Sequence, residues 1–182
     1  MKTSDLEKLE RRISELEDRA QLQDLLVRYC RGVDRRDREL IESAFWYSSP
    51  DDFEPRIGGP RLADYMETFG DAKCHTHFIG NQYLEIRGSN AYGETYFVSI
   101  HIREGDDGRP VTAVRGGRYI DEFEKRFEEW RIARRFKIDD WDRLDPITKR
   151  IAGIGDHAGG ARPADPTYEA LASWRKRYPR RD

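Results

Sequence analysis

The chain has 182 residues, enough for one domain with an appended segment. Its 33 Lys and Arg residues nearly balance 35 Asp and Glu residues, so the net charge of −2 argues against a nucleic-acid-binding module, which normally carries a basic excess. Aromatic residues make up 12% of the chain, more than a disordered sequence contains. No apolar run reaches the ~18 residues of a membrane helix. Charged heptads, rather than the apolar core of a signal peptide, follow Met1. Two cysteines make no disulfide framework, so we expect a compact cytoplasmic domain.

Helical spacing predicts the first element. Ser4 and Glu7 form a capping box, which is typical of a helix start. Apolar residues then recur at three- and four-residue steps in a narrow stripe flanked by charges, formed by Leu6, Leu9, Ile13, Leu16 and Ala20. Three heptads are too few to define a coiled coil. We therefore expect this stripe to pack on the domain or on a neighbouring subunit.

Two further helices are predicted before residue 70. The first helix continues with a wider apolar face to Gly32, where we expect it to end, and residues 33–37 are predicted to form a corner. Asp37 is predicted to cap a second helix from Arg38 to about Trp46. Loop residues separate it from a third short helix at about 61–69.

After Cys74 the apolar period changes to two, the period of a β-strand. This pattern predicts four strands, of which the first is bent: 75–87, 91–103, 111–127 and 130–138. Glycine and proline accumulate from Pro146, which predicts a tail ending in a short helix near residues 168–175. Helices followed by long antiparallel strands indicate an α+β fold, a curved sheet wrapped around helices as a cone with a cavity.

Asp34 and His77 are the first candidates for catalysis. A histidine near its ordinary pKa of about 6.5 can accept a proton at neutral pH. A carboxylate on its other ring nitrogen would fix the tautomer and stabilise the imidazolium. The spacing alone leaves another reading open, in which Asp34 is a turn residue after Gly32 and His77 a packed strand histidine.

A metal site is an alternative use of the histidines. His75 and His77 share one face of their strand, and His101 stands on the next strand, so three histidines could converge. No acidic or cysteine ligand stands at a diagnostic spacing, and a strand face turned to solvent or to a subunit explains the pattern equally well.

Aromatic and basic residues form a third set of candidates. Strand arginines could orient an anionic or phenolic substrate, whereas an exposed sheet face with long side chains would carry the same residues. The set comprises Tyr29, Trp46, Phe78, Tyr96, Arg115, Arg118, Tyr119, Arg134 and Arg135. The sequence holds no glycine-rich phosphate loop, nucleophile elbow or Cys-x-x-Cys motif.

Several blocks of the sequence resemble the SnoaL-like proteins of the nuclear-transport-factor-2-like superfamily. These blocks include Tyr29-Cys30-Arg31-Gly32-Val33-Asp34, Thr76-His77-Phe78-Ile79-Gly80-Asn81, Gly117-Arg118-Tyr119-Ile120-Asp121 and Trp130-Arg131-Ile132-Ala133-Arg134-Arg135. The blocks span about residues 16–145 in the family's order. The resemblance implies an α+β cone with a deep apolar pocket, flanked by an N-terminal helical extension over 1–15 and a tail over 146–182.

Within that superfamily the pattern is similar to a branch that contains scytalone dehydratase, bile-acid 7α-dehydratase and hexachlorocyclohexane dehydrochlorinase. The branch's aspartate falls on Asp34, its base histidine on His77, and the bile-acid enzyme's tyrosine on Tyr29. A second aspartate of that enzyme falls near Ser99 and is absent here. The implied activity is a cofactor-independent, metal-free dehydratase or related lyase acting on a hydrophobic hydroxylated aromatic or polycyclic compound.

The resemblance also implies partners and a substrate-binding set. The branch forms trimers, so we expect a homotrimer, and no nucleic-acid or membrane partner. The same fold hosts isomerases, cyclases and non-catalytic small subunits of ring-hydroxylating oxygenases, which remain alternatives. The expected substrate-binding residues are Trp46, Phe78, Asn81, Tyr96, Arg118, Tyr119, Arg134 and Arg135.

Overall fold

The computed structural model of the protein describes residues 3–46, 74–147 and 161–179. The predicted helix at 61–69 lies outside these residues. Helix α1 (Thr3–Arg35) is followed by α2 (Arg38–Glu42), and the sheet consists of β1 (Cys74–Arg87), β2 (Asn90–Glu104), β3 (Pro110–Arg126) and β4 (Glu129–Pro146). Helix α4 (Pro166–Arg177) comes last. No described helix is both long and apolar enough to cross a membrane.

The first helix does not end at Gly32, as predicted, but continues to Arg35. Gly32 serves close packing instead, because a Cβ there would lie 3.0 Å from the backbone nitrogen of Ile41 on α2. The chain turns at Arg36, which has a φ of 49°. The predicted cap is confirmed, since the Asp37 side chain accepts a hydrogen bond from the Leu40 amide at 3.3 Å.

Helix α2 is shorter than predicted because the chain leaves it to join the sheet. Phe45 forms a parallel bridge with Ile132 of β4. The Trp46 amide donates to the Ile132 carbonyl at 2.9 Å, and the Ile132 amide donates to the Ala44 carbonyl at the same distance. Backbone pairing with β4 therefore replaces the last helical turn that the apolar spacing suggested.

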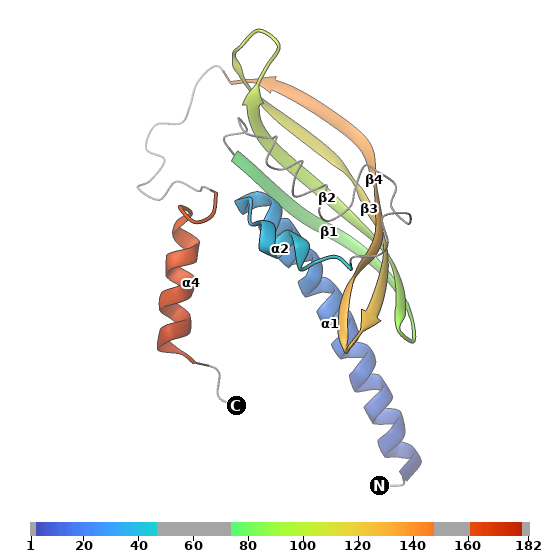
Figure 1. Cartoon of the computed structure of the whole chain (residues 1–182). Helices are drawn as coiled ribbons and strands as arrows, with labels where there is room; N and C mark the ends of the chain where they lie inside the picture. The colour runs from blue at the N-terminus through green and yellow to red at the C-terminus, as the bar shows by residue number, and fades with distance from the viewer. Residues whose placement is uncertain (1–2, 47–73, 148–160, 180–182) are drawn as a thin grey trace.

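The four strands form an antiparallel sheet in the order β1-β2-β3-β4. The predicted bend in β1 is a break of register between Ile79 and Gln82. Strand β4 runs well past the predicted end at 138, because Asp145 still pairs with Thr112 near the start of β3. The prediction of an α+β fold is confirmed: the sheet curves without closing, and α1 and α2 lie on its concave side (Figure 1).

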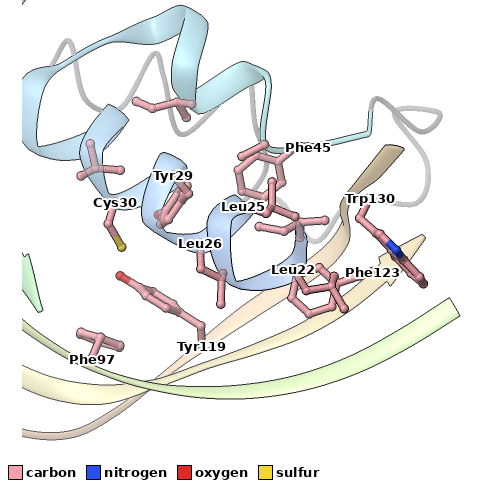
Figure 2. Close-up of a cluster of buried hydrophobic side chains, with 14 of the residues drawn as sticks. Leu22, Leu25, Leu26, Tyr29, Cys30, Phe45, Phe97, Tyr119, Phe123 and Trp130 are labelled. Carbon is pink, nitrogen blue, oxygen red and sulfur yellow. The ribbon is translucent and has the colours of Figure 1, made fainter. Parts of the chain in front are cut away.

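The core lies between α1 and the concave face of the sheet (Figure 2). Its largest fully buried side chains come from the middle of α1 and from β3 and β4: Leu22, Leu25, Leu26, Phe123, Trp130 and Ile132. The indole nitrogen of Trp130 donates to Asp18 on α1 at 2.7 Å. This bond fixes the helix to the β3–β4 end of the sheet, because a buried indole N–H needs a partner.

The two halves of α1 have different surroundings. The first turns project beyond the sheet (Figure 1), and the stripe residues Leu6, Leu9, Ile13 and Leu16 are 42–67% exposed. A rotation of about 100° per residue places this stripe on the side of α1 opposite Leu22, Leu26 and Tyr29, which face the sheet. The sequence predicted that the stripe packs either on the domain or on a neighbouring subunit. Packing on the domain is wrong for these turns, and packing on a neighbouring subunit stays a prediction.

Candidate active site

The side chains of His77 and Asp34 meet on the concave side of the sheet. The distance between His77 Nδ1 and Asp34 Oδ1 is 2.5 Å, and Asp34 Oδ2 accepts a hydrogen bond from the His77 backbone amide at 3.1 Å. The two side chains are only 7% and 14% exposed. Because an ionised carboxylate can only accept, Nδ1 carries the proton and Nε2 is left as the basic atom. The arrangement orients a histidine base.

Local structure explains why these two residues meet. Asp34 lies on the last turn of α1, and His77 lies near the start of β1. Strand alternation directs His75 and His77 to the same inner face, and the register places His77 opposite Ser99 and His75 opposite His101 on β2. Ser99 is buried, so a hydroxyl-bearing residue lies opposite the base in the register.

The other two histidines bind each other. His75 Nδ1 and His101 Nδ1 are 2.8 Å apart, and the His101 ring also lies edge-on to the His77 ring with centroids 5.7 Å apart. Burial, the main cause, lowers the pKa of both His75 and His101 to about 4, and the charge of Arg36 adds to this for His75. Among residues 3–46, 74–147 and 161–179, no three His, Cys, Asp or Glu side chains are placed to hold a metal ion.

The neutral His75–His101 pair predicts a loss of stability in mild acid. Both pKa values fall from about 6.5 to about 4 on folding, so the unfolded chain binds more protons between these limits. We expect the free energy of unfolding to fall as the pH is lowered from about 6.5 to about 4. Urea unfolding of the wild type and of His75→Gln/His101→Gln at pH 7, 5.5 and 4.5 measures this. An identical pH dependence in both proteins would contradict it.

A second polar group lies deeper in the core. The Arg135 guanidinium binds Asp121 through two hydrogen bonds, of 2.5 Å from Nε and 2.7 Å from Nη2, and both side chains are fully buried. It lies between the rings of Tyr29 and Tyr119, 4.3 and 4.2 Å from their centroids. Its Nη1 atom has no hydrogen-bond partner in the described part of the chain. A buried cation with a spare donor therefore faces two tyrosines.

Tyr29 and Cys30 are buried on α1 beside this group. Burial raises the pKa of Tyr29 to about 12, although the Arg135 charge opposes the shift, so the phenol stays protonated at neutral pH. Burial likewise raises the pKa of the Cys30 thiol to about 12, and Cys30 is electrostatically coupled to both Arg135 and Asp34. In Figure 2 the Tyr119 hydroxyl points toward Cys30. The concave side thus carries a base at one place and donors at another.

Four of the expected substrate-binding residues lie on the opposite, convex face. Strand alternation turns Phe78 away from His77, and Tyr96 and Phe78 are 50% and 59% exposed. Arg118 pairs with Asp140, and Arg134 with Glu122, both at the surface. The structure therefore does not bring these residues together with the histidine.

Two other expected substrate-binding residues, Asn81 and Trp46, lie apart from both the histidines and the Arg135–Asp121 pair. Asn81 is exposed in the β1 bulge. The Trp46 indole donates to the Glu124 carbonyl at 2.8 Å, and its ring is covered by Arg131 at 4.4 Å. Trp46 thus packs against β3 and β4, at a distance along the sheet from the β1–β2 histidines.

Sequence reasoning did not select Asp121 as part of the site. The alternation of β3 could have indicated it, because the apolar residues Tyr119 and Phe123 place Asp121, which lies midway between them, on the same inner face. A carboxylate there needs a buried cation, and Arg135 lies directly opposite in the register. Cys30 lies in the core beside this site, with only 5% of its surface exposed.

Comparisons with known proteins give the family of this arrangement. Residues 14–136 match the sequence profile of the SnoaL-like domain. An uncharacterized protein of Mycobacterium tuberculosis is 26% identical over 129 residues, which cover 68% of this chain and 86% of the relative.

Two solved structures share the fold. A hexachlorocyclohexane dehydrochlorinase superposes with a TM-score of 0.63 at 19% identity, over 79% of this chain and 98% of the other. A proposed scytalone dehydratase of Novosphingobium aromaticivorans gives a TM-score of 0.59 at 17% identity, over 75% and 97% of the two chains. At sequence identities this low the similarity establishes the shared fold, and the reaction has to be inferred from the residues of the site.

Proposed function

The chain belongs to the SnoaL-like family, and from this premise we propose that it is a cofactor-independent lyase acting on a hydrophobic hydroxylated aromatic or polycyclic compound. The observation that supports this most is the 2.5 Å contact between His77 Nδ1 and Asp34 Oδ1 on the concave side of the sheet. Structural neighbours named as a dehydrochlorinase and a proposed dehydratase agree with an elimination.

The proposed reaction is the loss of water across a carbon–carbon bond. His77 Nε2 removes a proton from carbon, the C–H electrons form the new double bond, and the hydroxyl leaves from the adjacent carbon. Asp34 holds the Nδ1 tautomer and stabilises the imidazolium that forms. The imidazolium or the protonated phenol of Tyr29 can supply the proton that the departing hydroxide needs, and Arg135 Nη1 can donate a hydrogen bond to it.

Surrounding side chains favour elimination over side reactions. Phe97 stacks on Tyr119 with ring centroids 4.4 Å apart, and both are buried on the concave side. Such apolar aromatic surface would bind the ring of the substrate and exclude water, which strengthens the His77–Asp34 interaction during the reaction.

A substrate screen tests the proposal. Hydroxylated aromatic dimers, steroids and naphthol-type polyketides are incubated with the wild type and with His77→Gln, and the absorbance of a new conjugated chromophore is followed together with the mass of the product. We expect at least one compound to lose water, or formaldehyde in a carbon–carbon cleavage, with the wild type alone. Equal turnover by His77→Gln would contradict the proposed mechanism.

We further propose that copies of the chain join through the exposed stripe of α1. The stripe has acidic residues along one edge and basic residues along the other, so parallel pairing brings Arg12 of one copy opposite Glu17 of another. Light scattering should give a multiple of the 21.4 kDa chain mass, three chains if the expected trimer forms. Leu9→Glu/Ile13→Glu should give single chains, whereas Ser14→Glu/Gln21→Glu, which adds the same charge beside the stripe, should not. A wild type that stays monomeric would overturn this.

A further inference from the structure

The residues just before and within the start of α4 form a connection that the family match at 14–136 does not include. We call residues 161–168 the C-terminal clasp. They lie beside the corner at which α1 ends and α2 begins, the same corner that carries Asp34. The clasp and the corner are more than 120 positions apart in the sequence, as in the hydrogen bond from Arg162 to Asp37. Their contacts therefore come from the tertiary structure alone.

Asp37 is the centre of the connection. Its Oδ2 accepts a hydrogen bond from the Tyr168 hydroxyl at 2.6 Å, and its Oδ1 accepts one from Arg162 Nη1 at 2.8 Å. The same Oδ1 also accepts the hydrogen bond from the Leu40 amide that caps α2. Asp37 is 2% exposed. Burial opposes its ionised form, yet the bonds from Tyr168, Leu40 and Arg162 outweigh burial and lower its pKa. The clasp thus stabilises a buried carboxylate three residues after Asp34.

The clasp also holds the residue that directly follows Asp34. The Arg162 amide donates to the Arg35 carbonyl at 2.7 Å. Arg35 Nε lies 3.0 Å from Asp165 Oδ2, and the Asp165 side chain is 1% exposed. Asp165 also caps α4 by accepting from the Thr167 amide at 3.0 Å. The clasp therefore binds directly to Arg35 and Asp37, the first and third residues after Asp34 in the chain.

The clasp adds little to the hydrophobic core. Helix α4 buries none of its residues, and Trp174 and Tyr178 are more than half exposed. The described contacts between this segment and the end of α1 and start of α2 are polar. They comprise hydrogen bonds, the ion pairs Arg35–Asp165, Arg162–Asp37 and Arg162–Glu39, and the stacking of Arg31 and Arg162 on the Tyr168 ring. Their effect is consequently local to the corner.

We infer that Asp165 and Tyr168 are positioning residues that hold the α1–α2 corner so that the Asp34 carboxylate stays within hydrogen-bond reach of His77. The inference rests on the proposed function. A displacement of about 1 Å at a catalytic group can cost on the order of 10²-fold in rate. The His77–Asp34 contact of 2.5 Å leaves little room for a corner that moves.

The test uses the full-length protein and needs no substrate at first. The imidazole proton between His77 and Asp34 gives a far-downfield proton NMR signal, assigned by its absence in His77→Gln. Tyr168→Phe and Asp165→Asn should shift or broaden this signal while circular dichroism shows that both variants remain folded. Tyr178→Phe and Glu169→Gln, which make equivalent changes at exposed positions in α4 and directly after it, should leave it unchanged.

Activity measurements on a compound from the screen complete the test. Tyr168→Phe should lower kcat roughly tenfold with KM nearly constant, because the ground-state binding surface is untouched. Unaltered NMR signals and kcat in both clasp variants, with a signal lost in Asp34→Asn, would overturn the inference and leave the proposed function standing. Full turnover by Asp34→Asn and His77→Gln would overturn the proposed function itself.

Discussion

Replacing His77 by alanine should lower kcat on the compound identified by the screen by roughly 10²–10⁴-fold, the usual contribution of a positioned general base. Asp34→Asn should cost nearly as much, because an amide can donate to Nδ1 and so favour the tautomer in which Nε2 carries the proton. The double variant His77→Ala/Asp34→Asn should be little worse than His77→Ala alone. Residues that act as one unit lose their function together.

Single-turnover kinetics measure these effects, and circular dichroism verifies that each variant is folded. Asp145→Asn is the matched control for Asp34→Asn, since Asp145 pairs with the exposed Arg143 near the end of β4. It should retain the wild-type rate. Fully additive losses in the double variant would show that His77 and Asp34 act separately, against the proposed mechanism.

Removal of one partner of the Arg135–Asp121 pair should cause the largest loss of stability in the molecule. Arg135→Met leaves the Asp121 carboxylate buried without its cation, and Asp121→Asn leaves the guanidinium without its counterion. Breaking a buried pair in this way typically costs about 3–5 kcal/mol. The pKa of Asp121 is already raised by burial, even with Arg135 beside it, which shows how strongly the site opposes an isolated charge.

Urea or thermal unfolding gives the size of this effect. Arg143→Met removes an arginine of similar geometry from the exposed pair with Asp145 and should change the unfolding free energy very little. Arg135→Met/Asp121→Leu should recover part of the loss, because no charge is left buried. A midpoint for Arg135→Met equal to that of the wild type would contradict this account of the core.

Sequence periodicity predicted the elements that are specified by residues close together in the chain. The bent first strand, the cap at Asp37 and the C-terminal helix all follow from local preferences, and the structure confirms them. The ends of α1, α2 and β4 could not be predicted, because contacts between distant segments set them. Gly32 packs against Ile41, Phe45 pairs with Ile132, and β3 extends β4 to Pro146.

The sequence by itself determined the α+β order, the placement of His75 and His77 on one face of β1 and the candidacy of Asp34 and His77, because strand alternation and helix periods are local rules. The tertiary structure alone decided that Asp34 reaches His77, that Asp121 neutralises Arg135, and that Phe78, Tyr96, Arg118 and Arg134 face the other side of the sheet. Register, curvature and the packing of α1 against β1 settle these points. They depend on how segments far apart in the chain pack together, which no local pattern specifies.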